Sequence, residues 1–158
     1  MLIFDFDGTL VEKLPIDYNA MRNELGVFFT TTDSFCPLVD KVRSFSTSGF
    51  SIIDKYEVLS LNNHIIKQDV LDMYINEDIK VIISRNGLKV IEQFFEMNNL
   101  PQPDFIACRD NCLNLKPHVD HLAPVFAFLG HRNVTIVGDS WHDKQLALNA
   151  QCDYVFIK

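Results

Sequence analysis

The sequence predicts an α/β fold in which helices flank a parallel sheet and a small helical insert follows the first strand. Three observations lead to this prediction. Short apolar runs recur along the chain and are continuous rather than alternating, as in strands buried on both faces. Helical patterns separate the later runs, and this alternation implies right-handed crossovers between parallel strands. Between the first and second runs, the sequence shows helical patterns alone.

The apolar runs are the expected strands. Each is short, and most end in polar residues or in a turn signal. A length of 158 residues suits one compact domain that carries an insert. The expected strands are Leu2–Phe6, Ile79–Ile83, Phe105–Cys108, Val134–Val137 and Tyr154–Ile157.

Helices are expected between the later strands. Leu88, Ile91 and Phe95 recur at helical spacing, with charged residues on the opposite side. Pro101 and Gly130 follow the first two helical patterns as stop signals. These helices are expected over residues 88–100, 119–129 and 141–150.

The insert is expected to be a small helical cap domain over residues 12–76, with residues 1–11 and 77–158 forming the core domain. An insert after the first strand would lie over the carboxyl edge of the sheet, where open α/β sheets bind ligands. Polar linkers are expected at residues 30–33 and 46–49. The helical patterns within the insert cover residues 17–25, 37–45, 51–61 and 64–74.

Composition narrows the class of protein. The chain has 14 Lys and Arg against 21 Asp and Glu, a net charge of −7, which is the opposite of a nucleic-acid-binding balance. No apolar run approaches the roughly 20 residues that span a bilayer. The first residues lack the basic region of a signal peptide. We therefore expect a cytoplasmic protein, a monomer or a homodimer, that binds neither nucleic acid nor membrane.

Cysteine usage fits a reducing compartment. Cys108 and Cys112 are followed by His118 and His121, and these four residues could bind zinc. Their spacing is not that of the usual zinc knuckles, and Cys108 ends an apolar run. Buried thiols are the favoured interpretation.

Acidic residues follow the first strand. Asp5 and Asp7 are two apart, so both side chains point to the same side of an extended chain. Like charges this close raise each other's pKa or recruit a cation. Gly8 permits a tight backbone turn beneath a ligand. The alternative is a simple polar turn after the strand.

The second strand ends in Ser84, Arg85 and Asn86, at the start of an expected helix. A hydroxyl, a guanidinium and free helix amides together suit a phosphate. Ser84 or Asn86 could equally cap the helix. Lys116, which precedes a proline, is typical of a surface residue when taken alone.

The fourth strand ends in a second acidic pair, Asp139 and Asp143. If Ser140 begins a helix, both acids lie at its N-terminus, where negative charge is favoured, and capping is the simpler role. Together with Asp5 and Asp7, however, they would place four carboxylates in one crevice. A hard divalent cation is the natural counter-charge, and Mg²⁺ is the commonest beside phosphate.

The order of these motifs resembles the haloacid dehalogenase-like (HAD) superfamily of phosphohydrolases, in its phosphoglycolate phosphatase-like branch. The resemblance extends over the whole chain and implies a Rossmann-like core with a cap after the first strand. The matching segments are DFDGTLV at residues 5–11, VIIS at 81–84, LKP at 115–117 and GDSWHD at 138–143.

The resemblance also implies roles for the residues that match. Asp5 would be the nucleophile that forms an aspartyl-phosphate, and Asp7 would be the general acid and base. Ser84 and Lys116 would hold the phosphoryl group. The expected Mg²⁺ ligands are Asp5, Asp7 through its backbone carbonyl, Asp139 directly, and Asp143 directly or through water.

Other residues are expected to contact the substrate. Those closest to the motifs are Gly8, Thr9, Arg85 and Asn86. Candidate specificity contacts in the insert are Lys13, Arg22, Lys41 and Arg43. In this family the residue pair after the first motif often includes a small hydroxyl residue, and here Glu12 and Lys13 replace it, which leaves the substrate open.

The resemblance implies a Mg²⁺-dependent phosphomonoesterase that acts on a small phosphorylated metabolite. Asp7 argues against a dehalogenase, because a halide leaving group needs no proton. Two alternatives remain: a phosphomutase or phosphotransferase that uses the same aspartyl-phosphate, and a non-catalytic module that keeps the fold.

Overall fold

The computed structural model describes residues 1–26 and 47–158 and contains one parallel sheet of five strands in the order β3-β2-β1-β4-β5. The α/β fold class is therefore confirmed. Because β1 is central, its carboxyl end lies between those of β2 and β4: Phe4 pairs with Ile82 on one side and Val137 on the other. The strands are β1 (Leu2–Phe4), β2 (Val81–Ile83), β3 (Phe105–Ala107), β4 (Thr135–Gly138) and β5 (Asp153–Phe156).

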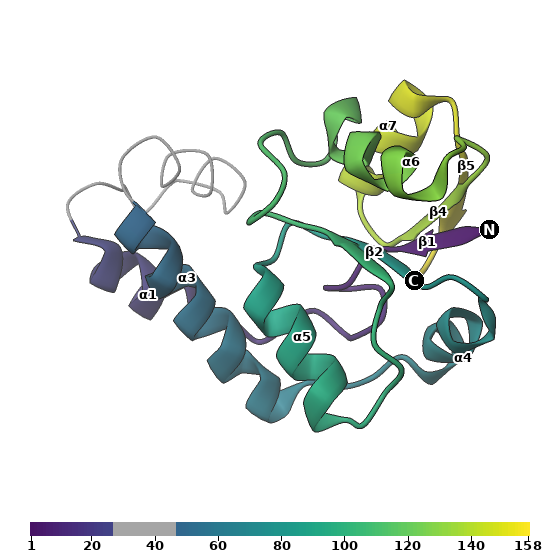
Figure 1. Ribbon diagram of the computed structural model, residues 1–158. Helices are drawn as coiled ribbons and strands as arrows, with labels where there is room; N and C mark the ends of the chain where they lie inside the picture. The colour runs from purple at the N-terminus through teal and green to yellow at the C-terminus, as the bar shows by residue number, and fades with distance from the viewer. Residues whose placement is uncertain (27–46) are drawn as a thin grey trace.

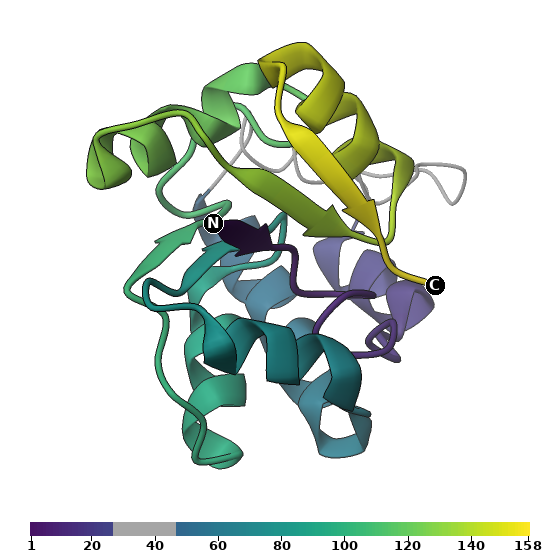
Figure 2. The ribbon, with the colours of Figure 1, turned by 90° about the vertical axis from the view of Figure 1, so that its right-hand side faces the viewer.

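Helices cover both faces of the sheet. Figure 1 shows α6 (Ala123–Leu129) and α7 (Trp141–Ala150) on one face, and α4 (Gln68–Asn76) and α5 (Leu88–Met97) on the other. The view in Figure 2 shows the same three layers from the side. The buried face of α5 consists of Val90, Ile91, Phe94 and Phe95, and the Phe94 ring lies 5.1 Å from that of Phe6, which follows β1.

The helix boundaries differ from the prediction where local backbone chemistry decides them. Helix α5 ends at Met97, and Asn99 takes a left-handed conformation with φ of 51°, so the helix has already ended before Pro101. The segment 119–129 divides into a 3₁₀ turn, η3 (Val119–Leu122), and α6, because Pro124 is tolerated only in the first turn of a helix. Gly130 ends α6 with φ of 73°, as predicted.

The insert contains α1 (Tyr18–Leu25), α3 (Thr47–Ser60) and a 3₁₀ turn, η2 (Leu61–Asn63), before α4. Helix α1 packs against α3, and α3 in turn contacts α5. The linker expected at 46–49 is largely helical, since α3 begins at Thr47. The expected helix over 37–45, the linker at 30–33, Lys41 and Arg43 lie outside the described residues.

The segment 64–67, expected to be helical, is extended instead. Ile66 forms an antiparallel bridge with Val11, and the Lys67 amide donates to the Leu10 carbonyl. Helix α4 therefore begins only at Gln68. Its Tyr74 ring lies 5.7 Å from the ring of Phe4 and 5.2 Å from that of Phe95, so α4 packs on the sheet beside α5. Within the described ranges, no helix is long and apolar enough to cross a bilayer.

Candidate active site

Three carboxylates gather at the carboxyl edge of the sheet. Asp5 follows β1, whereas Asp139 and Asp143 follow β4, and one oxygen of each lies within 4.8 Å of the others. The Asp5 amide donates to the carbonyl of Val137 at 2.9 Å, which extends the β1–β4 pairing to the start of the site. We call Asp5, Asp139 and Asp143 the acidic cluster.

Lys116 is the cation of this site. Its Nζ lies 2.6 Å from Asp5 Oδ1 and 2.6 Å from Asp143 Oδ1, and the side chain is almost completely buried. Its backbone amide donates to Nδ1 of His121 at 2.9 Å, which holds the chain in place before η3. Lys116 is thus not the surface residue that its local sequence indicates.

Asp143 is held from two sides. It is the third residue of α7 and forms a capping box: Ser140 donates to Asp143 Oδ2 from its hydroxyl and, at 3.1 Å, from its backbone amide. Oδ1 accepts from Lys116. Burial acts to raise the pKa of Asp143, but Lys116 and Ser140 outweigh it and lower the pKa. Asp143 therefore carries a negative charge in the interior.

The other two carboxyl groups of the cluster have raised pKa values. Burial, and then the charge of Asp143, raise the pKa of Asp5 to about 7, against the opposing effect of Lys116. The pKa of Asp139 is raised by burial and then by Asp143. A cation among these oxygens would remove the repulsion between Asp5, Asp139 and Asp143.

The residues present fit a divalent cation. The donors are carboxylate oxygens, which hard cations such as Mg²⁺ prefer. Gly8, with φ of 89°, leaves the space beside Asp139 open, because a Cβ there would collide with the Asp139 carboxylate. The backbone turn after Asp5 thus brings Gly8 against the acidic cluster.

Asp7 lies beside the cluster rather than in it. Its Oδ1 accepts from the Leu14 amide at 2.7 Å. Burial raises the pKa of Asp7 to about 6; the Leu14 amide opposes this rise, whereas Glu57 and Asp139 add to it. A carboxyl group with such a pKa can both give and take a proton near neutral pH.

The loop after β2 has a different environment from the predicted one. Ser84 is completely buried, and its hydroxyl donates to Asn86 Oδ1 at 2.9 Å. The helix amides expected to be free for phosphate are occupied: Gly87 donates to Glu57 Oε2 at 3.0 Å and Leu88 donates to Asp110 Oδ2 at 2.5 Å. The expectation that these amides are free is therefore wrong, because the carboxylates of Glu57 and Asp110 cap the start of α5.

The other residues predicted to contact the substrate differ in burial and in the partners that they contact. Arg85 is half-buried, and its Nη1 lies 3.2 Å from Nε2 of His142. Thr9 is completely buried, and its hydroxyl has no hydrogen-bond partner among the described residues. Lys13 is exposed and pairs with Asp139 at 3.7 Å. Arg22 lies on α1 over the ring of Tyr18.

The cysteines do not form a metal site in the described part of the chain, where the acidic cluster is the one group of three or more metal-binding side chains. Burial raises the pKa of Cys108 to about 12, so this residue is a neutral thiol. His121 uses Nδ1 to accept from Lys116. Cys108 and Cys112 are both buried, as the favoured interpretation expects.

Comparisons with solved structures identify the fold. A crystal structure of CbbY from Rhodobacter sphaeroides in complex with phosphate matches with a TM-score of 0.75 at 17% identity, covering 99% of this chain and 86% of that one. A predicted phosphoglycolate phosphatase from Haemophilus somnus matches with a TM-score of 0.67 at 18% identity, over 98% and 84%. A HAD family hydrolase from Deinococcus radiodurans with bound phosphate and sodium matches with a TM-score of 0.61 at 14% identity, over 97% and 78%.

The chain has the HAD-like fold. The sequence itself matches no family model and no curated protein. The evidence for the fold is therefore the sheet order, the position of the insert and these structural matches.

The sequence did not predict the roles of three buried residues in this HAD-like chain. Glu57 and Arg109 are charged yet buried, and His121 holds the backbone of Lys116. Arg109 could have been found, because it follows β3 just as Asp5, Ser84 and Asp139 follow their strands. Glu57 follows no strand, and in the sequence it is only one of several polar residues in an expected helix of the insert.

Proposed function

We propose that the protein is a Mg²⁺-dependent phosphomonoesterase that acts on a small phosphorylated metabolite. One observation carries the proposal: Lys116 Nζ bridges Asp5 and Asp143 of the acidic cluster, and a further carboxyl group, that of Asp7, follows two residues after Asp5. The phosphate bound in two of the similar structures supports the same class of ligand.

Asp5 is the proposed nucleophile. One of its carboxylate oxygens attacks phosphorus, and the bond from phosphorus to the leaving oxygen breaks, which leaves an aspartyl-phosphate on Asp5. Asp7 donates its proton to the leaving alkoxide, and then takes a proton from the water that hydrolyses the aspartyl-phosphate. Lys116 offsets negative charge on the phosphoryl oxygens, and Ser84 is the proposed hydroxyl donor to one of them.

The proposed Mg²⁺ ligands are the carboxylates of Asp5 and Asp139 and the backbone carbonyl of Asp7. When bound, the ion would offset the repulsion between a carboxylate and a phosphate dianion. Asp143 is committed on both oxygens to Lys116 and Ser140, so we propose that it supports the site through these contacts.

We also propose that the insert acts as the cap. Glu57 on α3 supports this, because its carboxylate accepts from the Gly87 amide at 3.0 Å, in the loop that also carries Ser84. Since α4 packs on the sheet through Tyr74, we propose that the cap ends before α4 and not at residue 76.

The test is hydrolysis of para-nitrophenyl phosphate with Mg²⁺ and with a chelator. Wild type should release nitrophenol and an equal amount of phosphate when Mg²⁺ is present, which distinguishes hydrolysis from transfer to a second hydroxyl. Asp5→Asn should lose about 10³-fold or more in kcat. Asp153→Asn, an exposed carboxylate on β5, is the matched control and should stay active. Persistent turnover by Asp5→Asn would refute the nucleophile.

A further inference from the structure

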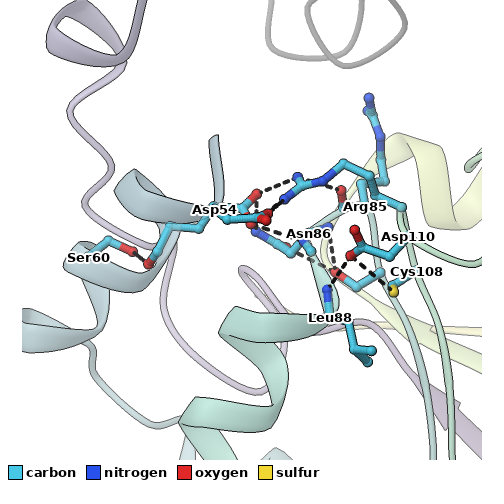
Figure 3. A network of polar contacts seen from close by, with 11 residues as sticks. Asp54, Ser60, Arg85, Asn86, Leu88, Cys108 and Asp110 are labelled. Atoms are coloured by element: carbon cyan, nitrogen blue, oxygen red, sulfur yellow. Dashed lines mark hydrogen bonds and ion pairs between the residues drawn. The ribbon is translucent and has the colours of Figure 1, made fainter. Parts of the chain in front are cut away.

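A buried ion pair joins the insert to the loops after β2 and β3. Glu57 of α3 is completely buried, and Arg109, which follows Cys108, is 2% exposed. The guanidinium donates to both carboxylate oxygens of Glu57, at 2.8 and 2.9 Å. Arg109 also donates to Asp54, one turn earlier on α3, at 2.5 Å. Figure 3 shows the network, with Asp54 from α3 facing the loop that carries Asn86.

Glu57 also reaches the loop that carries Ser84. Its Oε1 accepts from Asn86 Nδ2 at 3.2 Å, and its Oε2 accepts from the Gly87 amide at 3.0 Å. Gly87 is the N-cap of α5 and offers no side-chain cap, so Glu57 performs that role from another helix. A side chain at residue 87 would collide with Arg109 and Asp54.

The chemistry of Glu57 sets the orientation of Asn86. An ionised carboxylate only accepts hydrogen bonds, so Asn86 must turn its Nδ2 toward Glu57 and its Oδ1 toward Ser84. Oδ1 then accepts from the Ser84 hydroxyl at 2.9 Å, while the Asn86 amide donates back to that hydroxyl oxygen at 3.2 Å. A chain of hydrogen bonds therefore runs from Arg109 through Glu57 and Asn86 to Ser84.

From these contacts we infer that Glu57 is a positioning residue, which acts through Asn86 to hold Ser84 for the phosphoryl group and ties that loop to the insert. The inference rests on the proposed function, since Ser84 is there the phosphoryl-binding hydroxyl. It adds a residue of the insert to the determinants of phosphate affinity, although Glu57 itself has no need to touch the ligand.

The experiment measures binding of inorganic phosphate in the presence of Mg²⁺ by calorimetry, beside kcat and KM for para-nitrophenyl phosphate. Glu57→Gln should weaken phosphate binding and raise KM about tenfold, the effect of one misplaced hydrogen bond. Asp54→Asn is the matched control. It removes a carboxylate from Arg109 on the same helix but touches neither Asn86 nor Gly87 in the hydrogen bonds of the described chain, and it should leave phosphate binding within about twofold.

A double-mutant cycle with Asn86→Ala separates positioning from general stability. Asn86→Ala alone should weaken phosphate binding, and adding Glu57→Gln should then have little further effect, because the chain is already broken. Equal effects in both backgrounds, or unchanged phosphate affinity in Glu57→Gln, would overturn the inference. If Glu57→Gln fails to fold, Glu57→Asp, which keeps the charge opposite Arg109 but shortens the reach to Asn86, decides by the same cycle.

The two proposals fail in different ways. If wild type binds phosphate but does not hydrolyse the ester, the proposed function fails while the binding cycle still decides the role of Glu57. If wild type hydrolyses the ester and Glu57→Gln binds phosphate normally, the inference alone fails. A wild type that binds no phosphate overturns both.

Discussion

At the scale of single residues, the site depends on a buried imbalance of charge. Lys116 is the one cation paired with the acidic cluster from inside the protein in the described ranges, and it contacts two of the three carboxylates. Asp139 is left with the exposed Lys13 at 3.7 Å, a pair that contributes little. These acids were predictable because each follows a buried strand. The distribution of Lys116 between Asp5 and Asp143 was not, because it depends on side-chain reach across residues far apart in sequence.

Gly8→Ala should disable the site without unfolding the protein. The new Cβ would displace the Asp139 carboxylate, and a misplacement of about 1 Å can cost about 10²-fold in rate. Gly130→Ala is the matched control: its φ is also positive, at 73°, but nothing lies within 4 Å of the added atom. It should cost about 1–2 kcal/mol of stability and leave kcat/KM intact. Equal activity losses in the two variants would contradict this account of Gly8.

His121 should make stability depend on pH. Burial lowers its pKa to about 3, against 6.5 in the unfolded chain. Below pH 6.5 the unfolded chain therefore binds a proton that the folded protein does not, and falling pH favours unfolding through this residue. Asp5 and Asp7 act in the opposite direction, because their pKa values are raised.

A difference measurement isolates that histidine. His121→Gln keeps an acceptor for the Lys116 amide but cannot be protonated. Between about pH 7.5 and pH 5, wild type should lose about 2 kcal/mol more unfolding free energy than His121→Gln, measured by urea denaturation. Parallel curves for the two proteins would show that His121 is not buried as a neutral ring.

At the scale of elements, the predictions succeeded where the signal is local. The helical spacing of α5, the Gly130 stop and the Ser140 cap are patterns within a few residues, and the structure confirms them. Residues 64–67 departed from prediction because a bridge between Ile66 and Val11 outweighs helical spacing. The pairing of Glu57 with Arg109 spans 52 residues, and no local pattern indicates it.

Ser140→Ala tests whether the start of α7 supports the site as well as the helix. Loss of the cap should cost about 1–2 kcal/mol of stability. It should also lower kcat/KM, because Asp143 loses the hydroxyl that holds Oδ2. Asp17→Ala at the N-terminus of α1 is the control, since Asp17 caps Ala20 on the surface at 2.9 Å and should lower stability alone. If both variants keep full activity, Asp143 needs no support from Ser140.

At the scale of the whole molecule, a net charge of −7 combines with carboxylates concentrated at one edge of the sheet. Screening by any salt should reduce the overall self-repulsion. A specific cation site should stabilise the folded protein further, and this additional stabilisation should be lost when the acidic cluster is altered. The fold class follows from the alternation of strands and helices, whereas the strand order and the contribution of the insert depend on contacts that only the folded chain provides.

Mg²⁺ should therefore stabilise the folded protein beyond the effect of ionic strength. At about 100 times the dissociation constant, the gain in unfolding free energy should be about 2.7 kcal/mol, by linkage to the folded state. NaCl at equal ionic strength is the solvent control. Asp139→Asn should lose most of the Mg²⁺-specific gain, whereas the surface variant Asp153→Asn should keep it. A gain that NaCl reproduces would argue against a specific site.

The sheet order has a kinetic consequence. Strand β1 pairs with β4, where Leu2 lies opposite Thr135, so the central ladder of the sheet joins segments that are far apart in the sequence. Proteins dominated by such non-local pairings have a high contact order and fold slowly, because the entropy cost of closing a long loop comes before the contacts that offset it. Asp5 and Asp139 follow these two strands, so the reactive centre cannot assemble from any local fragment. The reactive centre therefore forms only when the sheet forms.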